Sequence, residues 1–207
     1  MKKIEFVIKR GSLARYIGPG DDVAVPEGVT DIDDMSFADN VNVTGVTIPN
    51  GVRHIGRCAF FGCTNLKTVS IPEGIEKIWD NAFDGCTSLT SVSVPGSTAE
   101  IGRYAFKGCA ALKDVIIHEG TAVIGRSAFV RCASLEAVSI PASVDEIGEC
   151  AFLNCTGLKR ADILNGDTVI GEDAFGDCPN LVIHAPAKSR AEKYARKNGI
   201  RFEAMET

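Results

Sequence analysis

The chain has 207 residues, 45% of them hydrophobic and 24% charged, which is typical of a folded domain and too apolar for a disordered chain. Its net charge of −5 argues against nucleic acid as a partner, because phosphate binding needs a basic surface. No segment approaches the roughly 18 consecutive apolar residues of a membrane span, so we expect no membrane span either.

Residues 1–20 are predicted to form an N-terminal cap. Ile4, Phe6 and Ile8 alternate with polar residues, and a turn then leads into residues 13–17, a pattern that favours a β-hairpin. The apolar stretch before the basic pair at 9–10 is too short for a cleavable signal peptide. We therefore expect a cytoplasmic protein unless a leader has been removed, in which case it is secreted or displayed on the cell surface.

The central part of the chain, residues 21–186, is an internal repeat with a period of 23 residues. Phenylalanine recurs at this spacing at Phe37, Phe60, Phe83, Phe106, Phe129, Phe152 and Phe175. Cysteine follows three residues later at Cys63, Cys86, Cys109, Cys132, Cys155 and Cys178. Leucine comes three residues after that at Leu66, Leu89, Leu112, Leu135, Leu158 and Leu181. Such regularity predicts one solenoid domain of seven 23-residue coils with little regular helix.

A single repeat shows how the coil is built. In the segment LKTVSIP, Leu66, Val69 and Ile71 are expected to point inward, while Thr68 and Ser70 point outward from the same short strand. The proline that follows cannot donate to a strand ladder and ends the strand.

The rest of the unit turns the chain back. Ile75 and Ile78 should be buried, and Phe83 should lie under the next coil. A lone unit has no second layer and cannot stay folded, whereas stacking buries each large side chain for roughly 1.5–3 kcal/mol.

The repeat pattern AFxxCxxLxxVxIPxxVxxIG resembles the BspA-like bacterial leucine-rich repeats over residues 23–186. The resemblance implies a right-handed β/α solenoid with a parallel sheet on its concave side. It also implies recognition of, or adhesion to, a partner through the repeat surface. The family has no catalytic residues to transfer to this sequence, so the resemblance favours a protein that is not an enzyme.

Residues 187–207 are predicted to form a C-terminal cap. Residues 189–198 read as a helix, with Ser189 and Glu192 in a capping box and Asn198-Gly199 at its end. Ile200 and Phe202 are expected in a last short strand. Both ends of the array are then covered, as a solenoid requires.

The cysteines and histidines do not predict a chemical site. The six repeat cysteines are spaced by whole coils rather than in the short pairs of a zinc site, so we expect reduced structural thiols, no metal and no cofactor. Cys58 and Cys150 share another position of the repeat but lie four coils apart, about 19 Å, and cannot pair. His54, His118 and His184 fall in distant coils, which a straight stack keeps apart, so no catalytic triad is expected.

The concave face is the predicted ligand-binding surface. Most coils present small outward residues there, but two coils differ, and the first of them carries Asp114, Ile116 and His118. The second carries Arg160, Asp162 and Leu164. Between them lies the coil of Ser139, so the two richer rows should flank a strip about 9.6 Å wide. Apolar and charged groups together suit a protein or peptide partner.

A second surface gives the alternative function. Trp79 stands where other coils have glycine, and Phe61 occupies a position that is elsewhere small or polar. These two residues suggest self-association through the convex or lateral side, in a homodimer or a larger structural assembly. Binding to a protein or peptide remains the favoured function. The sequence does not name the partner.

Overall fold

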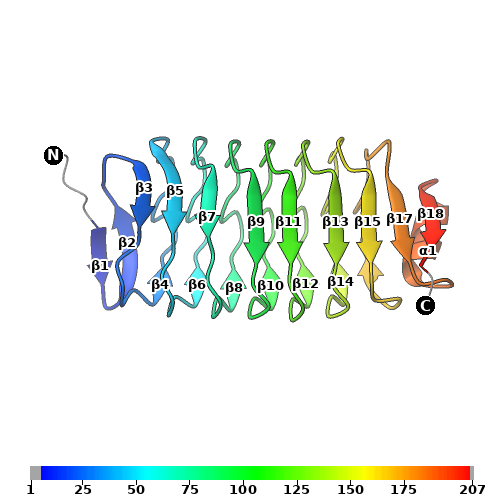
Figure 1. Ribbon diagram of the computed structural model, residues 1–207, viewed down its shortest axis with the longest axis horizontal. Helices are drawn as coiled ribbons and strands as arrows, with labels where there is room; N and C mark the ends of the chain where they lie inside the picture. The colour runs from blue at the N-terminus through cyan, green and yellow to red at the C-terminus, as the bar shows by residue number, and fades with distance from the viewer. Residues whose placement is uncertain (1–5, 206–207) are drawn as a thin grey trace.

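A computed structural model describes residues 6–205 as a solenoid whose coils stand side by side in a straight row (Figure 1). The seven coils expected from the phenylalanine repeat are present, each contributing one strand to a front row and one to a back sheet. An incomplete eighth turn, a helix and a final strand follow them. The predicted fold, a leucine-rich-repeat solenoid with a parallel sheet, is confirmed.

The front row carries the longer strands and faces the viewer in Figure 1. We call its outward-facing side the strand face. Its members are β3 (Asp21–Ala24), β5 (Val43–Thr47), β7 (Thr68–Ser70), β9 (Ser91–Val94), β11 (Asp114–Ile117), β13 (Ala137–Ile140), β15 (Arg160–Ile163), β17 (Val182–Ala185) and β18 (Arg201–Ala204). The hydrogen-bonded ladder is interrupted between β7 and β9 and between β11 and β13.

The back sheet is continuous and has nine strands, beginning with an N-terminal hairpin. The remaining seven are β4 (Asp31–Ile32), β6 (His54–Ile55), β8 (Lys77–Ile78), β10 (Glu100–Ile101), β12 (Val123–Ile124), β14 (Glu146–Ile147) and β16 (Val169–Ile170). Each has only two residues, of which the isoleucine points into the core. The sequence analysis treated this segment as a simple turn, because two residues are too short to show an alternating pattern.

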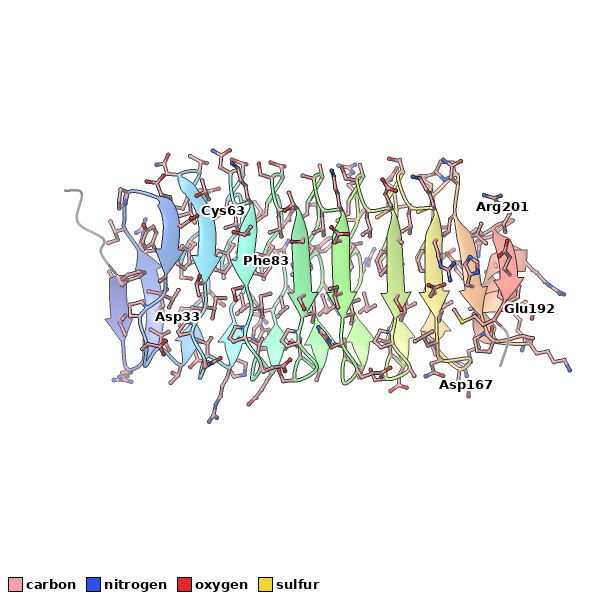
Figure 2. All side chains as sticks on the ribbon, in the orientation of Figure 1. Asp33, Cys63, Phe83, Asp167, Glu192 and Arg201 are labelled. Atoms are coloured by element: carbon pink, nitrogen blue, oxygen red, sulfur yellow. The ribbon has the colours of Figure 1, made fainter. Side chains whose placement is uncertain are left out.

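The repeat phenylalanines form one continuous aromatic stack through the core. Neighbouring ring centroids lie 4.8 to 5.2 Å apart. From Phe60 onward the ring planes are within 5° of parallel. Phe83, labelled in Figure 2, is one of these rings. The ring spacing matches the roughly 4.8 Å between hydrogen-bonded strands, so backbone pairing and ring stacking are satisfied by the same rise per coil.

The repeat cysteines form a second ladder beside the rings. Each donates its thiol proton to the carbonyl oxygen of the phenylalanine in the preceding coil, with Sγ···O distances of 3.1 to 3.3 Å. All eight cysteines are free, and Cys58 and Cys150 are only half-buried. Burial raises the pKa of Cys63 and of Cys178 to about 12, and it also raises the pKa values of Cys86 and Cys109.

These thiols predict a loss of stability in alkali. In the unfolded chain a thiol ionises near its usual pKa of 9.0, whereas the folded Cys63 stays protonated up to about pH 12. Between these values the unfolded state holds fewer protons, so the free energy of unfolding falls by up to about 1.4 kcal/mol per pH unit for each such thiol. The stabilisation is complete below pH 9.0 and is lost as the pH rises towards about 12.

Urea unfolding at a series of pH values measures this effect. Other groups also titrate in alkali, so the Cys109→Ala variant, which removes one buried thiol, is the control. We expect its stability to fall less steeply with pH than that of the original chain. Parallel curves for the two proteins would contradict a protonated thiol ladder.

The N-terminal end is covered by a hairpin of β1 (Phe6–Lys9) and β2 (Ser12–Tyr16), which pair antiparallel. Tyr16 continues the aromatic stack, with its ring centroid 5.0 Å from that of Phe37. The first coil therefore has an aromatic neighbour on its outer side. Ile4, expected in this strand, lies outside the described residues.

The C-terminal end is covered by helix α1 (Arg190–Lys197) and by β18, which pairs parallel with β17. The Ser189 hydroxyl accepts a hydrogen bond from the Glu192 backbone N–H. The Glu192 carboxylate accepts from the N–H of Lys188, one residue earlier than in a standard capping box. Tyr194 packs edge-on against Phe175 and accepts a hydrogen bond from its N–H. Glu192 and Arg201 mark this end of the solenoid in Figure 2.

Candidate functional site: the strand face

The strand face is a set of outward-facing rows that run across the coils. The pairing register places Ser93 beside Ile116, and it places Ser139, Asp162 and His184 in line on three successive strands. Side chains that are 23 residues apart in the sequence are thus direct neighbours in most of the row. The seven residues predicted for ligand binding all lie on β11, β13 and β15 or directly after them.

Ile116 is the main apolar group of this face. Its side chain is 55% exposed at the centre of β11. It borders an open depression of about 360 Å³, which is also lined by Val69 and Ile71 of the β7 coil and by Asp114. Exposed aliphatic walls with a carboxylate at the edge are suited to an apolar side chain that carries a nearby positive charge.

His118 lies beside the same depression but is already engaged. Its Nε2 lies 2.9 Å from the Ser93 hydroxyl oxygen, in hydrogen-bonding distance across neighbouring coils. The contact links β9 to the segment after β11.

Arg160 and Asp162 form an ion pair with each other. The Arg160 Nε lies 2.9 Å from both carboxylate oxygens of Asp162, two residues further along β15. The hydrogen bond and the negative charge of Asp162 raise the pKa of Arg160. Leu164, directly after this strand, has an exposed side chain. The pair thus presents a largely neutralised polar ridge next to an exposed leucine.

The structure separates the predicted site into two groups. Asp114 and Ile116 line the depression on the N-terminal side, where Val69 and Ile71 complete the wall, and His118 contacts Ser93, which also lines it. The ion pair and Leu164 lie on the other side of β13, whose Ser139 stands next to Asp162. Any partner that touches both groups must cross β13.

Phe61 and Trp79 occupy separate positions on the coil. Phe61 directly follows the stacked Phe60, and 39% of its side chain is exposed. The Trp79 ring has the Lys77 Nζ 4.3 Å and the Arg57 Cζ 5.2 Å from its centroid. An aromatic ring with two cations beside it is less available for apolar pairing than the sequence suggested.

The described residues form neither a three-ligand metal site nor a membrane-spanning helix. Within residues 6–205, no three histidine, cysteine, aspartate or glutamate side chains come together in a way that could hold a metal ion. In the same part of the chain no helix has the length and apolar character needed to cross a membrane.

Comparison with known proteins now identifies the repeat. The sequence matches the family of BspA type leucine-rich repeat regions in six copies, over residues 21–129 and 76–190. The chain belongs to this family. No curated protein sequence matches this leucine-rich-repeat protein.

Two solved structures resemble it. A leucine-rich repeat protein of T. pallidum shares 29% identity with a TM-score of 0.79, over 98% of this chain and 95% of that chain. One from Bacteroides ovatus shares 21% identity with a TM-score of 0.53, over 89% of this chain and 69% of that chain. The second likeness shows the fold alone, while the first extends to nearly the whole length of both proteins.

Two members of the depression were missed by the sequence analysis of this leucine-rich-repeat protein. Val69 and Ile71 were expected to be core residues, but each is only half-buried. Their strand, β7, has three residues and does not hydrogen-bond to β9. The missing ladder leaves their outer sides open. No signal in the sequence distinguishes this coil from its neighbours, which have valine or isoleucine at the corresponding inward positions.

Proposed function

We propose that this protein is a non-catalytic binding module that holds a protein or peptide partner on its strand face. The supporting observation is the depression at Ile116, where the aliphatic side chains of Val69, Ile71 and Ile116 border the same hollow as the carboxylate of Asp114. Leu164, 43% exposed, and the Arg160–Asp162 pair extend the contact surface on the other side of β13. The relatives in its family are repeat proteins, which present a long regular surface to a partner.

The rigidity of the face supports the same proposal. The inward residues of β11 and β15 belong to the same buried core as the phenylalanine stack, so the backbones of these strands are held in place before any partner binds. A fixed surface loses little conformational entropy on binding, which favours affinity. An extended peptide running across the coils would place one side chain in the depression and another, about four residues further on, beside Leu164.

Peptides selected from a random display library against the whole protein provide the probe. The double variant Ile116→Ser with Arg160→Ala is expected to weaken their binding by about tenfold or more, because a central apolar anchor and a charged contact are both lost. Dissociation constants are measured by calorimetry, and circular dichroism checks that the fold is intact.

The back sheet offers a matched control. Val169 on β16 has an exposed aliphatic side chain, and Arg126 has an exposed guanidinium paired with Glu149. The double variant Val169→Ser with Arg126→Ala should bind the selected peptides as the original chain does. If this variant loses binding and the first does not, the partner sits on the back sheet. A stable dimer without ligand, seen by light scattering, that is disrupted by Trp79→Gly with Phe61→Ser would favour the self-assembly alternative.

A further inference from the structure

One corner of the coil, next to the back sheet, is occupied by glycine in five of the seven coils. At Gly102 a β-carbon would come within 2.6 Å of the backbone carbon of Trp79 in the preceding coil. The corresponding distances to the preceding backbone are 2.5 to 2.7 Å at Gly56, Gly125, Gly148 and Gly171. We call this position the glycine corner. A β-carbon added at any of these five glycines would press on the backbone of the preceding coil, which is consistent with glycine in five of the seven coils.

The two exceptions stand on either side of a single coil. Asp33 occupies the glycine corner of the first coil and Trp79 that of the third, so Gly56 lies between them. With no side chain at Gly56, an open depression of about 600 Å³ remains, and both exceptional residues line it. Asp33 is labelled near the N-terminal end in Figure 2. The only two side chains that break the corner rule thus form opposite walls of one hollow.

The hollow is strongly acidic. Asp31 and Asp34 line it together with Asp33, and no lysine or arginine of the described residues does so. Over residues 17–52 the sequence has seven acidic residues and no basic one, a net charge of −7 against −5 for the whole chain. A concave surface of one sign concentrates oppositely charged groups from solution.

The aromatic wall favours the same sign of charge. The ring of Trp79 is already approached by Lys77 and Arg57, although neither of these side chains lines the hollow. Lys77 is also held by an ion pair with Glu100 in the following coil. The π-face of an indole attracts cations, and among aromatic rings it does so most strongly. His54, a further lining residue, has its Nδ1 2.7 Å from the Asp31 carboxylate.

We propose that this hollow binds the cationic side chain of an arginine or lysine on a partner protein. The ligand's charged end would lie among Asp31, Asp33 and Asp34, and its aliphatic stem or guanidinium plane would lie along Trp79. The site is distinct from the depression at Ile116, which lies on the strand face. It explains why a large aromatic residue occupies a corner that otherwise excludes side chains.

The single tryptophan of the chain makes the test direct, because its fluorescence reports on the wall of the hollow. The probe is the capped peptide acetyl-Gly-Arg-Gly-amide, and its citrulline counterpart has the same shape without the charge. We expect a saturable change in tryptophan emission with the arginine peptide alone, which weakens as salt is added. Free arginine is expected to bind no more tightly than the capped peptide, since only the side chain is recognised.

Variants locate the binding on this surface by calorimetry. Asp33→Asn and Asp34→Asn should each weaken binding of the arginine peptide by about two- to fivefold. Asp145→Asn, an exposed carboxylate elsewhere on the solenoid, should not change it. Trp79→Gly should abolish the calorimetric signal, while its midpoint of urea unfolding stays the same or rises because glycine suits the corner.

Three results would overturn the proposal. The first is an equal response to the arginine and citrulline peptides. The second is undiminished binding in Asp33→Asn and Trp79→Gly. The third is binding of free arginine without binding of the capped peptide, which would indicate a small-molecule ligand instead of a protein side chain.

Discussion

Replacing Phe106 by alanine is expected to lower the free energy of unfolding by about 3–5 kcal/mol. Phe106 is fully buried in the middle of the stack, with the rings of Phe83 and Phe129 each 5.1 Å away. Removing its ring leaves a cavity enclosed by backbone that is hydrogen-bonded on both sides, so the neighbouring coils cannot close it. Urea unfolding followed by tryptophan fluorescence measures the loss.

Phe175→Ala is the matched control at the end of the array. The outer neighbour of Phe175 is Tyr194, which lies 6.2 Å away and edge-on. Phe175 also borders an open depression of about 670 Å³ between the last coil and α1. Side chains there can relax and water can enter the space left by the ring. We therefore expect the free energy of unfolding to fall by about 1–2 kcal/mol less than in Phe106→Ala. Equal losses at the two positions would contradict a continuous stack with a looser C-terminal end.

Gly125→Ala is expected to destabilise the protein by about 1–3 kcal/mol or more, although alanine is a small residue. The new β-carbon would lie 2.7 Å from the carbonyl oxygen of Ile101 and 2.8 Å from the carbonyl carbon of Gly102. Both atoms belong to the backbone of the preceding coil, which cannot move without breaking the back-sheet ladder. The midpoint of urea unfolding should fall accordingly.

Gly166→Ala controls for the general effect of adding a methyl group. Its β-carbon would meet Ser189 and Pro186 side-chain atoms at 3.7 and 3.8 Å, which is ordinary van der Waals contact. We expect it to be neutral, or slightly stabilising because alanine restricts the unfolded chain. If Gly125→Ala were equally harmless, the coils would be less tightly stacked at the glycine corner than the structure shows.

The sequence predicted the solenoid because every coil repeats the same buried residues without insertion. Seven phenylalanines at one spacing place one ring in each coil at the same position, and in the structure each ring lies on the next. The outward direction of Ile116 also followed from the alternation of its strand. The structure shows that its side chain is exposed. Periodic burial is thus readable from a single sequence.

Features that depend on the backbone between repeats could not be predicted. The back sheet consists of two-residue strands whose pairing partners lie a whole coil away, so no local pattern marks them. The interruption of the ladder beside β7, which opens the depression at Val69 and Ile71, likewise has no counterpart in the residue types.

In the candidate sites, too, the residue types could be predicted from the sequence but their contacts could not. Asp114 and Arg160 were identified as unusual outward residues, but the pairing of Arg160 with Asp162 on its own strand depends on side-chain rotamers. Trp79 was recognised as an exception to the repeated glycine. That Trp79 and Asp33 line the same depression, on either side of Gly56, depends on how the first three coils stack.

Carboxyl footprinting of the protein bound to a selected peptide tests the central claim most directly. Asp114 is exposed on the strand face and Glu146 is exposed on the back sheet, so the two carboxylates report on opposite sides of the solenoid. A partner held on the strand face should protect Asp114 from chemical modification and leave Glu146 as reactive as in the free protein. Protection of Glu146 with Asp114 unchanged would contradict the proposed binding surface.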